Sequence, residues 1–191
     1  MGKQFGIREI LKKNKFIPII NFTDLSTVEK TINHLMSNDI TCLEITLRSD
    51  IAWDAIELAQ KIKPTNFKIG VGTVTSISHL KKCKFLNVDF IVSPGTSPEL
   101  RNALNDYNIP FLPGVMTPSD IISGLEQDWD TFKLFPFNLA GGMKALSTYN
   151  SVFPNVKFCP TGGVNETNYN DCLKLNNVLS VGGSWLTENI K

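Results

Sequence analysis

Short apolar runs alternate with longer amphipathic segments along almost the whole chain. The apolar runs are bounded by Gly, Pro, Asn or Asp, which is typical of buried strands. We expect strands over residues 16–20, 40–47, 67–73, 88–92, 109–112, 131–135, 156–160 and 178–181. In the segments between them, apolar residues recur three and four positions apart, which predicts helices with one buried face. These helices cover residues 24–36, 51–62, 76–83, 98–107, 118–126, 142–149 and 166–175.

The alternation of strands and helices predicts an α/β fold with a parallel sheet. Eight strands favour a closed (β/α)8 barrel, the TIM barrel, over an open sheet. A further helix over residues 5–13 would precede the first strand. Because the chain has 191 residues and no visible linker or low-complexity tract, we expect a single domain over residues 1–191.

Composition and charge argue against several classes of partner. The net charge is +1 and the basic residues are scattered, so there is no electrostatic case for nucleic acid or a membrane surface. No apolar stretch is long enough to span a bilayer, and the N-terminus lacks the apolar segment of a signal peptide. The four cysteines form no C-x-x-C pair and no zinc-like cluster with histidine. We therefore expect a cytoplasmic protein with reduced cysteines and no metal.

One lysine interrupts an apolar run. Lys133 lies within residues 129–136, whose β-branched and aromatic side chains otherwise indicate a buried strand. Burying an unpaired ammonium is costly and favours the neutral amine. A neutral amine can attack a ketone and form a Schiff base. The alternative is a lysine near the strand end whose ammonium reaches water.

The period of the strands predicts a carboxylate on the same inner face as Lys133. In the strand over residues 40–47, Leu43 and Ile45 would face the helices, whereas Glu44 would face the barrel axis. Glu44 and Lys133 would then share one central cavity. A carboxylate beside an imine-forming amine is a plausible proton relay. The alternative is a buried salt bridge that serves only the structure.

Glycine and polar residues collect where the predicted strands end, which is the face of such a barrel that carries chemistry. Two turns, 161–163 and 182–184, contain paired glycines whose backbone N–H groups no side chain would shield. Such turns can hold a phosphate, although glycines also serve tight turns. Arg48 follows the second strand and offers a fork suited to a carboxylate. The alternative for Arg48 is a surface pair with Asp50.

Several motifs in this order resemble the bacterial 2-keto-3-deoxy-6-phosphogluconate (KDPG) aldolases, which also act as 4-hydroxy-2-oxoglutarate (KHG) aldolases. The motifs are Leu43-Glu44-Ile45-Thr46-Leu47-Arg48, Gly70-Val71-Gly72-Thr73, Val92-Ser93-Pro94-Gly95, Leu112-Pro113-Gly114-Val115, Phe132-Lys133-Leu134-Phe135-Pro136, Phe158-Cys159-Pro160-Thr161-Gly162-Gly163-Val164 and Ser180-Val181-Gly182-Gly183-Ser184-Trp185-Leu186. The resemblance runs from about residue 16 to residue 186, so it covers nearly the whole chain.

The resemblance implies a role for each matching residue. Lys133 stands where the family has its Schiff-base lysine, and Glu44 stands where it has its general acid/base. The residues implied to line the pyruvate pocket, with Arg48 and Thr73 near the carboxylate, are Arg48, Thr73, Pro94 and Thr161. The residues implied to contact phosphate are Gly162, Gly163 and Ser184. The resemblance also implies class I chemistry with neither metal nor cofactor, a small-molecule substrate, and a homotrimer.

Two departures from the family pattern stand out. After Lys133 the family usually reads Phe-Pro-Ala-Glu, whereas this chain reads Phe135-Pro136-Phe137-Asn138. A charge is lost there and a bulky ring is gained, which bears on substrate preference more than on imine chemistry. The sequence also ends at Lys191, where family members usually continue with another helix. We therefore expect a shortened C-terminal helix.

Together, the residues and the resemblance predict a Schiff-base lyase that cleaves 2-dehydro-3-deoxy-6-phosphogluconate to pyruvate and glyceraldehyde 3-phosphate. The same site would also cleave 4-hydroxy-2-oxoglutarate to pyruvate and glyoxylate. One alternative is the same chemistry on 2-dehydro-3-deoxy-6-phosphogalactonate. Another is a sugar-phosphate isomerase, which would need an acid/base pair but no imine-forming lysine. A third is a sugar-phosphate-binding barrel without catalysis.

Overall fold

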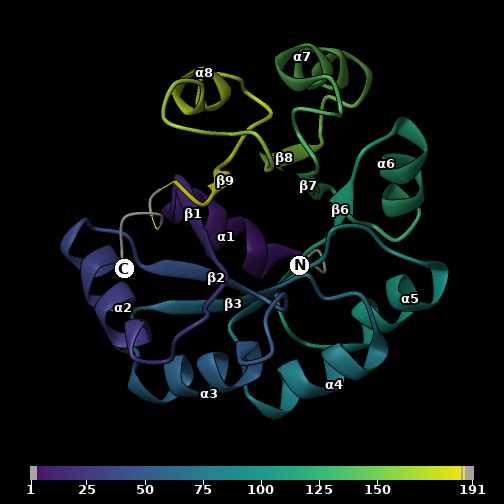
Figure 1. The fold of residues 1–191 in the computed structure, drawn as a ribbon. Coiled ribbons are helices and arrows are strands. Elements are labelled where there is room, and N and C mark those ends of the chain that lie inside the picture. Colours follow the sequence, from purple (N-terminus) through teal and green to yellow (C-terminus); the bar gives the residue numbers. More distant parts are fainter. Residues whose placement is uncertain (1–3, 186, 188–191) are drawn as a thin grey trace.

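The computed structural model of the chain describes residues 4–185 and residue 187. The helices are α1 (Phe5–Lys13), α2 (Thr27–Ser37), α3 (Ala52–Ile62), α4 (Ile77–Phe85), α5 (Pro98–Asp106), α6 (Pro118–Leu125), α7 (Gly142–Val152) and α8 (Tyr169–Leu173). The strands are β1 (Phe16–Ile20), β2 (Cys42–Thr46), β3 (Lys68–Gly72), β4 (Phe90–Val92), β5 (Phe111–Leu112), β6 (Gly114–Val115), β7 (Thr131–Leu134), β8 (Lys157–Pro160) and β9 (Val181–Gly183). Helices α2 to α8 lie outside a strongly curled set of strands (Figure 1).

All the paired strands run parallel, as the strand–helix alternation predicts. They form a six-stranded sheet in the order β5-β4-β3-β2-β1-β9 and a three-stranded sheet in the order β6-β7-β8. β5 and β6 are consecutive pieces of chain separated only by Pro113, which has no N–H to donate to a ladder. Two isolated parallel bridges, Phe158–Val178 and Thr161–Gly182, join β8 and the residue after it to the segment that contains β9.

The strands separate two apolar layers. The larger layer lies between the sheet and the outer helices and contains Leu43, Ile45 and Phe132. The smaller layer lies on the inner side of the strands and includes Cys42 of β2 together with Ile7 of α1. The predicted alternation of side chains along β2 and β7 is therefore confirmed.

Helix α1 closes the N-terminal ends of the strands. Gln4 donates from Nε2 to the carbonyl of Thr131 (2.9 Å), and its Oε1 accepts from the Thr131 amide (2.9 Å). Arg8 donates to the Thr131 hydroxyl and forms an ion pair with Asp130 at 2.9 Å. These contacts leave the opposite, C-terminal ends of the strands open to hold a site.

Several predicted bounds are wrong by two or three residues: α2, for example, begins at Thr27 and not at residue 24, and α7 ends at Val152 and not at residue 149. Two further differences, in β9 and α8, have a structural reason. The last strand was expected over residues 178–181 but spans Val181–Gly183, because β9 pairs with residues 16–18 of β1 in that register. Helix α8 begins at Tyr169, later than expected. Asn165 explains the delay, since its side chain accepts hydrogen bonds from the amide and hydroxyl of Thr167 (2.9 and 2.7 Å) and holds a turn there.

The expected shortened helix after β9 falls largely on residues 188–191, which lie outside the described residues. Among the described helices, none has the length and apolar character needed to cross a bilayer. The four cysteines are buried free thiols.

Candidate active site

Lys133 and Glu44 meet inside the fold. Lys133 Nζ donates a hydrogen bond to Glu44 Oε1 at 3.2 Å, and the two side chains are only 4% and 3% exposed. They come from β7 and β2, which are not neighbours in either sheet, so the contact crosses the interior. Gly72 of β3 leaves the space for this carboxylate, because a Cβ at that position would overlap Glu44. The two side chains therefore meet on the inner side of the strands, as the strand period predicts.

Two buried thiols lie near this ion pair. Burial raises the pKa of Cys159 to about 12, and the Lys133 charge lowers it while the Glu44 charge raises it. Burial also raises the pKa of Cys42, with smaller contributions in the same direction from Cys159 and Glu44. Both thiols therefore stay protonated near neutral pH and form part of the apolar surroundings of the pair.

A cavity of about 150 Å³, the reaction cavity, opens above Lys133. Six of the predicted site residues line it: Arg48, Lys133, Thr161, Gly162, Gly163 and Ser184. It is also lined by Gly183, which belongs to the predicted turn 182–184, and by Ile19, Phe135 and Val164, to which the sequence assigned no role. Phe135 could have been found, since it lies two residues after Lys133 and so continues the same strand face.

Arg48 and Thr73 meet at the edge of the reaction cavity. Arg48 Nε donates to Thr73 Oγ1 at 3.2 Å, and the alternative ion pair of Arg48 with Asp50 is not formed. Thr73 has a φ of 64°, a left-handed conformation that is uncommon for a β-branched residue. The geometry thus brings a guanidinium and a hydroxyl together at the ends of β2 and β3.

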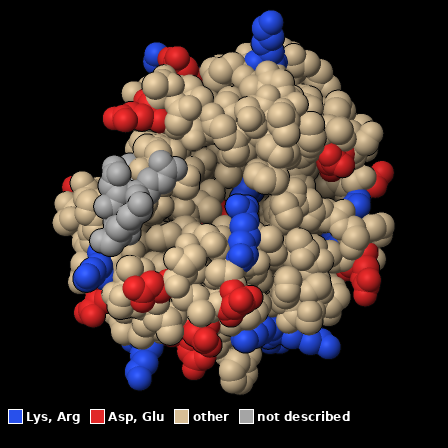
Figure 2. Space-filling view, in the orientation of Figure 1, with Lys and Arg blue, Asp and Glu red and all other residues tan. Residues whose placement is uncertain are grey.

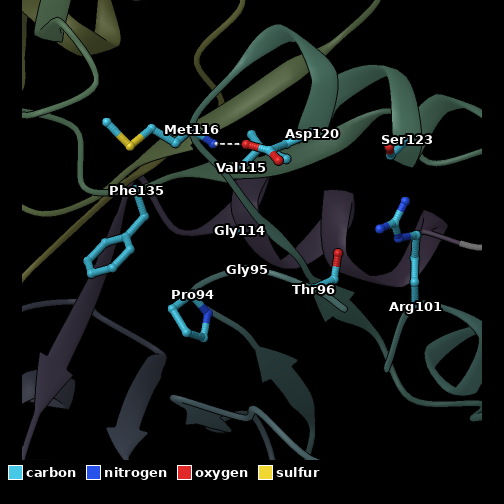
Figure 3. A pocket seen from close by; sticks show the side chains of 10 residues that line it. All are labelled: Pro94, Gly95, Thr96, Arg101, Gly114, Val115, Met116, Asp120, Ser123 and Phe135. Atoms are coloured by element: carbon cyan, nitrogen blue, oxygen red, sulfur yellow. Dashed lines mark hydrogen bonds between the residues drawn. The ribbon is translucent and has the colours of Figure 1, made fainter. Parts of the chain in front are cut away.

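Pro94 lies in a neighbouring cavity. It lines a separate space of about 100 Å³, together with Gly95 and Gly114. Phe135 lines this space, shown in Figure 3, and also lines the reaction cavity, so it is a wall that the two cavities share. The structure therefore brings Pro94 next to the other predicted residues but does not give it a surface in the reaction cavity.

The turn after β8 presents free backbone donors to the reaction cavity. Gly162 and Gly163 have φ angles of 87° and 89°, which glycine adopts at little cost. Within the described part of the chain, no group accepts a hydrogen bond from either amide. The carbonyls of Thr161 and Gly162 accept from the amides of Phe137 (2.8 Å) and Asn138 (3.0 Å), so the loop after β7 holds this turn in place.

Basic side chains mark the centre of this face. Figure 2 shows them in a short line at the middle of the molecule, while other basic and acidic side chains lie around the edge and some acidic ones lie just below the line. Across residues 4–185 and 187, no three His, Cys, Asp or Glu side chains gather in a group that could hold a metal ion. The arrangement offers an amine, a carboxylate, a guanidinium and backbone donors within one small region, which suits chemistry on an anionic carbonyl compound.

Comparison with known proteins identifies the family. The family model "KDPG and KHG aldolase" matches residues 7–191. The 2-dehydro-3-deoxy-phosphogluconate aldolase of Dickeya dadantii is 36% identical over 178 residues, which cover 93% of this chain and 83% of that protein. The KHG/KDPG aldolase of Escherichia coli K12 is also 36% identical, over 177 residues that cover 93% and 83% of the two chains.

Solved structures agree with these relatives. A KDPG aldolase from Legionella pneumophila, crystallised with pyruvate captured at low pH as a covalent carbinolamine intermediate, superposes with a TM-score of 0.92. It is 37% identical, and the match covers 95% of this chain and 88% of that chain. The 2-keto-3-deoxy-6-phosphogluconate aldolase of Zymomonas mobilis has the same TM-score at 31% identity, covering 97% and 89%. The chain therefore belongs to the KDPG and KHG aldolase family.

Proposed function

We propose that the chain is a class I aldolase that cleaves 2-dehydro-3-deoxy-6-phosphogluconate to pyruvate and glyceraldehyde 3-phosphate. The observation that carries this proposal is the buried contact between Lys133 and Glu44 at 3.2 Å beneath an open cavity. The covalent pyruvate intermediate of the Legionella relative supports it, since pyruvate is the expected product here.

Lys133 is the proposed nucleophile. It passes a proton to Glu44 and attacks the C2 ketone of the substrate to form a carbinolamine. Glu44 gives this proton to the carbinolamine hydroxyl, which leaves as water, so that a protonated imine and an ionised Glu44 remain. Glu44 then removes the proton of the C4 hydroxyl, the bond between C3 and C4 breaks, and its electron pair moves into the imine. Glyceraldehyde 3-phosphate leaves, C3 of the enamine is protonated, and water releases pyruvate and restores the amine.

The remaining predicted residues hold the two ends of the substrate. Arg48 and Thr73, joined at 3.2 Å, are the proposed carboxylate contacts, and Thr161 completes the pyruvate pocket as the structure outlines it. Pro94 lines the adjoining cavity, so its proposed contact with pyruvate stays a prediction. The proposed phosphate contacts are Gly162, Gly163 and Ser184. The free amides of the two glycines support this role, because a phosphate needs donors that it can approach closely.

A second substrate follows from one comparison. The Escherichia coli relative bears both names, KHG and KDPG aldolase, at 36% identity. We therefore propose that this chain also cleaves 4-hydroxy-2-oxoglutarate to pyruvate and glyoxylate. Its distal carboxylate is smaller than a phosphate and lies closer to the reacting carbons, so binding of this substrate should depend less on the turn after β8.

The closed barrel and the assembly belong to the same proposal. The two single bridges between the β8 and β9 segments, and the continuity of β5 with β6, support closure of the strands into a (β/α)8 barrel. By analogy with the family, we propose a homotrimer. Four buried free thiols support a cytoplasmic location, where thiols stay reduced.

Borohydride trapping tests the chemistry directly. Pyruvate with borohydride should attach a pyruvyl group to Lys133, as peptide mapping by mass spectrometry would reveal, and should inactivate the enzyme. Lys133→Met should abolish both the adduct and turnover. Lys157→Met is the matched control, because Lys157 lies in the adjacent strand β8 of the same three-stranded sheet, yet its Nζ donates to the carbonyl of Asn176 at 3.0 Å. An adduct on another lysine, or none, would contradict the assignment.

A further inference from the structure

A second cavity adjoins the reaction cavity and has a charged lining of its own. It has a volume of about 100 Å³ and lies between the end of β4, β6, and the helices α5 and α6 (Figure 3). We call it the Arg101 cavity, after the arginine that α5 contributes. Neither Arg101 nor the helix α6 has a part in the proposed reaction.

Arg101 carries a donor without an acceptor. Its Nε atom is buried, and nothing in residues 4–185 or 187 accepts a hydrogen bond from it. An arginine cannot give up its proton, so the cost of this unmade bond persists and is larger than for a neutral donor. Figure 3 shows the side chain extending from α5 toward α6, where Ser123 also lines the cavity. An acceptor from outside the protein would remove this cost.

The acidic residue of the cavity does not provide that acceptor. Asp120 Oδ2 accepts from the amides of Met116 (3.0 Å) and Thr117 (2.8 Å) and from the Thr117 hydroxyl (2.9 Å). Burial opposes ionisation of Asp120, but these hydrogen bonds and the nearby Arg101 charge outweigh it and hold its pKa below the usual range. No ion pair joins Asp120 to Arg101 in the part of the chain that the structure describes. The Asp120 carboxylate thus binds backbone and hydroxyl donors at the start of α6, and Arg101 can still attract an anion.

We propose that the Arg101 cavity is a binding subsite for a small carboxylate. The fork of N–H groups on a guanidinium matches the two oxygens of a carboxylate, and the hydroxyls of Thr96 and Ser123 line the same space. The volume admits several water-sized groups, which suits a short organic acid. The subsite also adjoins the proposed nucleophile. Phe135 forms part of its wall, and the centroid of the Phe135 ring lies 5.2 Å from Lys133 Nζ.

Propionate is a suitable probe, because it has a carboxylate but no ketone that could react with Lys133. Isothermal titration calorimetry on the intact protein should detect saturable binding. Arg101→Gln removes the charge and should weaken this binding by at least about tenfold. Arg101→Lys, which keeps the charge but loses the fork, should weaken it less. Lys81→Gln, a change at an exposed position of α4, is the charge-matched control and should leave it unchanged.

A second variant guards against misfolding of the arginine mutant. Ser123→Leu fills the cavity from α6 without touching Arg101 and should also weaken propionate binding, while thermal melts verify that each variant is folded. Binding that survives both Arg101→Gln and Ser123→Leu but is lost in Arg48→Gln would place the carboxylate in the reaction cavity and overturn the proposal. An absence of saturable binding, or binding of inorganic phosphate in place of propionate, would overturn it as well. None of these outcomes depends on imine formation.

Discussion

Two lysine–carboxylate clusters in this protein differ in how completely their charges are hydrogen-bonded. Asp89, just before β4, accepts from Lys63 Nζ at 2.8 Å, from Lys68 Nζ at 2.9 Å and from the Ile69 amide at 2.9 Å. Lys63 donates in addition to the carbonyl of Phe67. This cluster lies at the N-terminal ends of β3 and β4.

The inner cluster, formed by Lys133 and Glu44, is more deeply buried and makes fewer hydrogen bonds. Among the described residues, the Glu44 carboxylate has one hydrogen-bond partner, the ammonium of Lys133 at 3.2 Å. Their side chains are 4% and 3% exposed, against 15% and 13% for Lys63 and Asp89. The inner pair also opens onto the reaction cavity, which Lys133 lines.

The difference separates a structural ion pair from a reactive one. A carboxylate that accepts hydrogen bonds from three donors has little tendency to take up a proton. A buried ion pair with unused hydrogen-bond donors and acceptors can bind a substrate and transfer protons, at some cost in stability. The location agrees, because in parallel α/β folds ligands bind at the carboxyl ends of the strands and not at their amino ends, where the Asp89 cluster lies. Three changes test this contrast.

The largest effect is expected at the inner pair. Glu44→Gln keeps the shape and can still accept from Lys133, but it cannot take up a proton at neutral pH. Turnover should fall by about a hundredfold or more, the typical contribution of a general acid–base group, while substrate binding and the melting temperature change little. Steady-state kinetics and a thermal melt measure both. A folded variant with near wild-type turnover but a loss of several kcal/mol in stability would make this pair structural.

The opposite outcome, a loss of stability with unchanged turnover, is expected at the outer cluster of Asp89, Lys63 and Lys68. Asp89→Asn leaves two lysines without their carboxylate, so the free energy of unfolding should fall by about 2 kcal/mol, measured by urea denaturation, with turnover unchanged. Asp171→Asn is the control: its pair with Lys174 is exposed (61% and 74%), so its loss should cost well under about 1 kcal/mol. A fall in turnover with Asp89→Asn would remove the distinction between the clusters.

The pH dependence of stability sharpens the same test. Burial opposes ionisation of Asp89, but hydrogen bonds from Lys63, the Ile69 amide and Lys68 outweigh it and lower its pKa below the usual 3.8. A lowered folded-state pKa means that the contribution is complete above about pH 4 and is lost as the pH falls further. The wild type should therefore lose more stability than Asp89→Asn between pH 5 and pH 2.5. Parallel stability curves for the two proteins would contradict this account.

The smallest effect is expected at the turn after β8. Gly163→Ala adds a Cβ at a φ of 89° and within 2.6 Å of Asn138 Cβ, which should displace the free amides. The KM for the phosphorylated substrate should rise by about tenfold, and cleavage of 4-hydroxy-2-oxoglutarate should change less. Gly95→Ala is the matched control, because its added Cβ meets no atom within 4 Å. Equal losses on both substrates would mean that the turn shapes the fold rather than selecting phosphate.

Local patterns predicted much of this molecule. The bounds of α1 and β1 agree with the expectation from apolar spacing, and the inward direction of Glu44 and Lys133 follows from the two-residue period of a strand. These features depend on a few consecutive residues, which is why the sequence alone carries them. The predictions failed where local signals are weak. Two of the three residues of β9 are glycines, which have low strand propensity, and the extent of β9 is set by its pairing with β1.

The amino-acid sequence by itself determined the order of strands and helices, the inward face of Glu44 and Lys133, and the family resemblance. Only the tertiary structure decided the distances: the 3.2 Å contact between β2 and β7, the bond from Arg48 to Thr73, and the division by Phe135 into two cavities. The Arg101 cavity likewise exists only because residues of α5, β6 and α6, far apart in the sequence, line one space. Such distances depend on how far the sheet curls and on the register of strands far apart in the chain, and no local pattern encodes either.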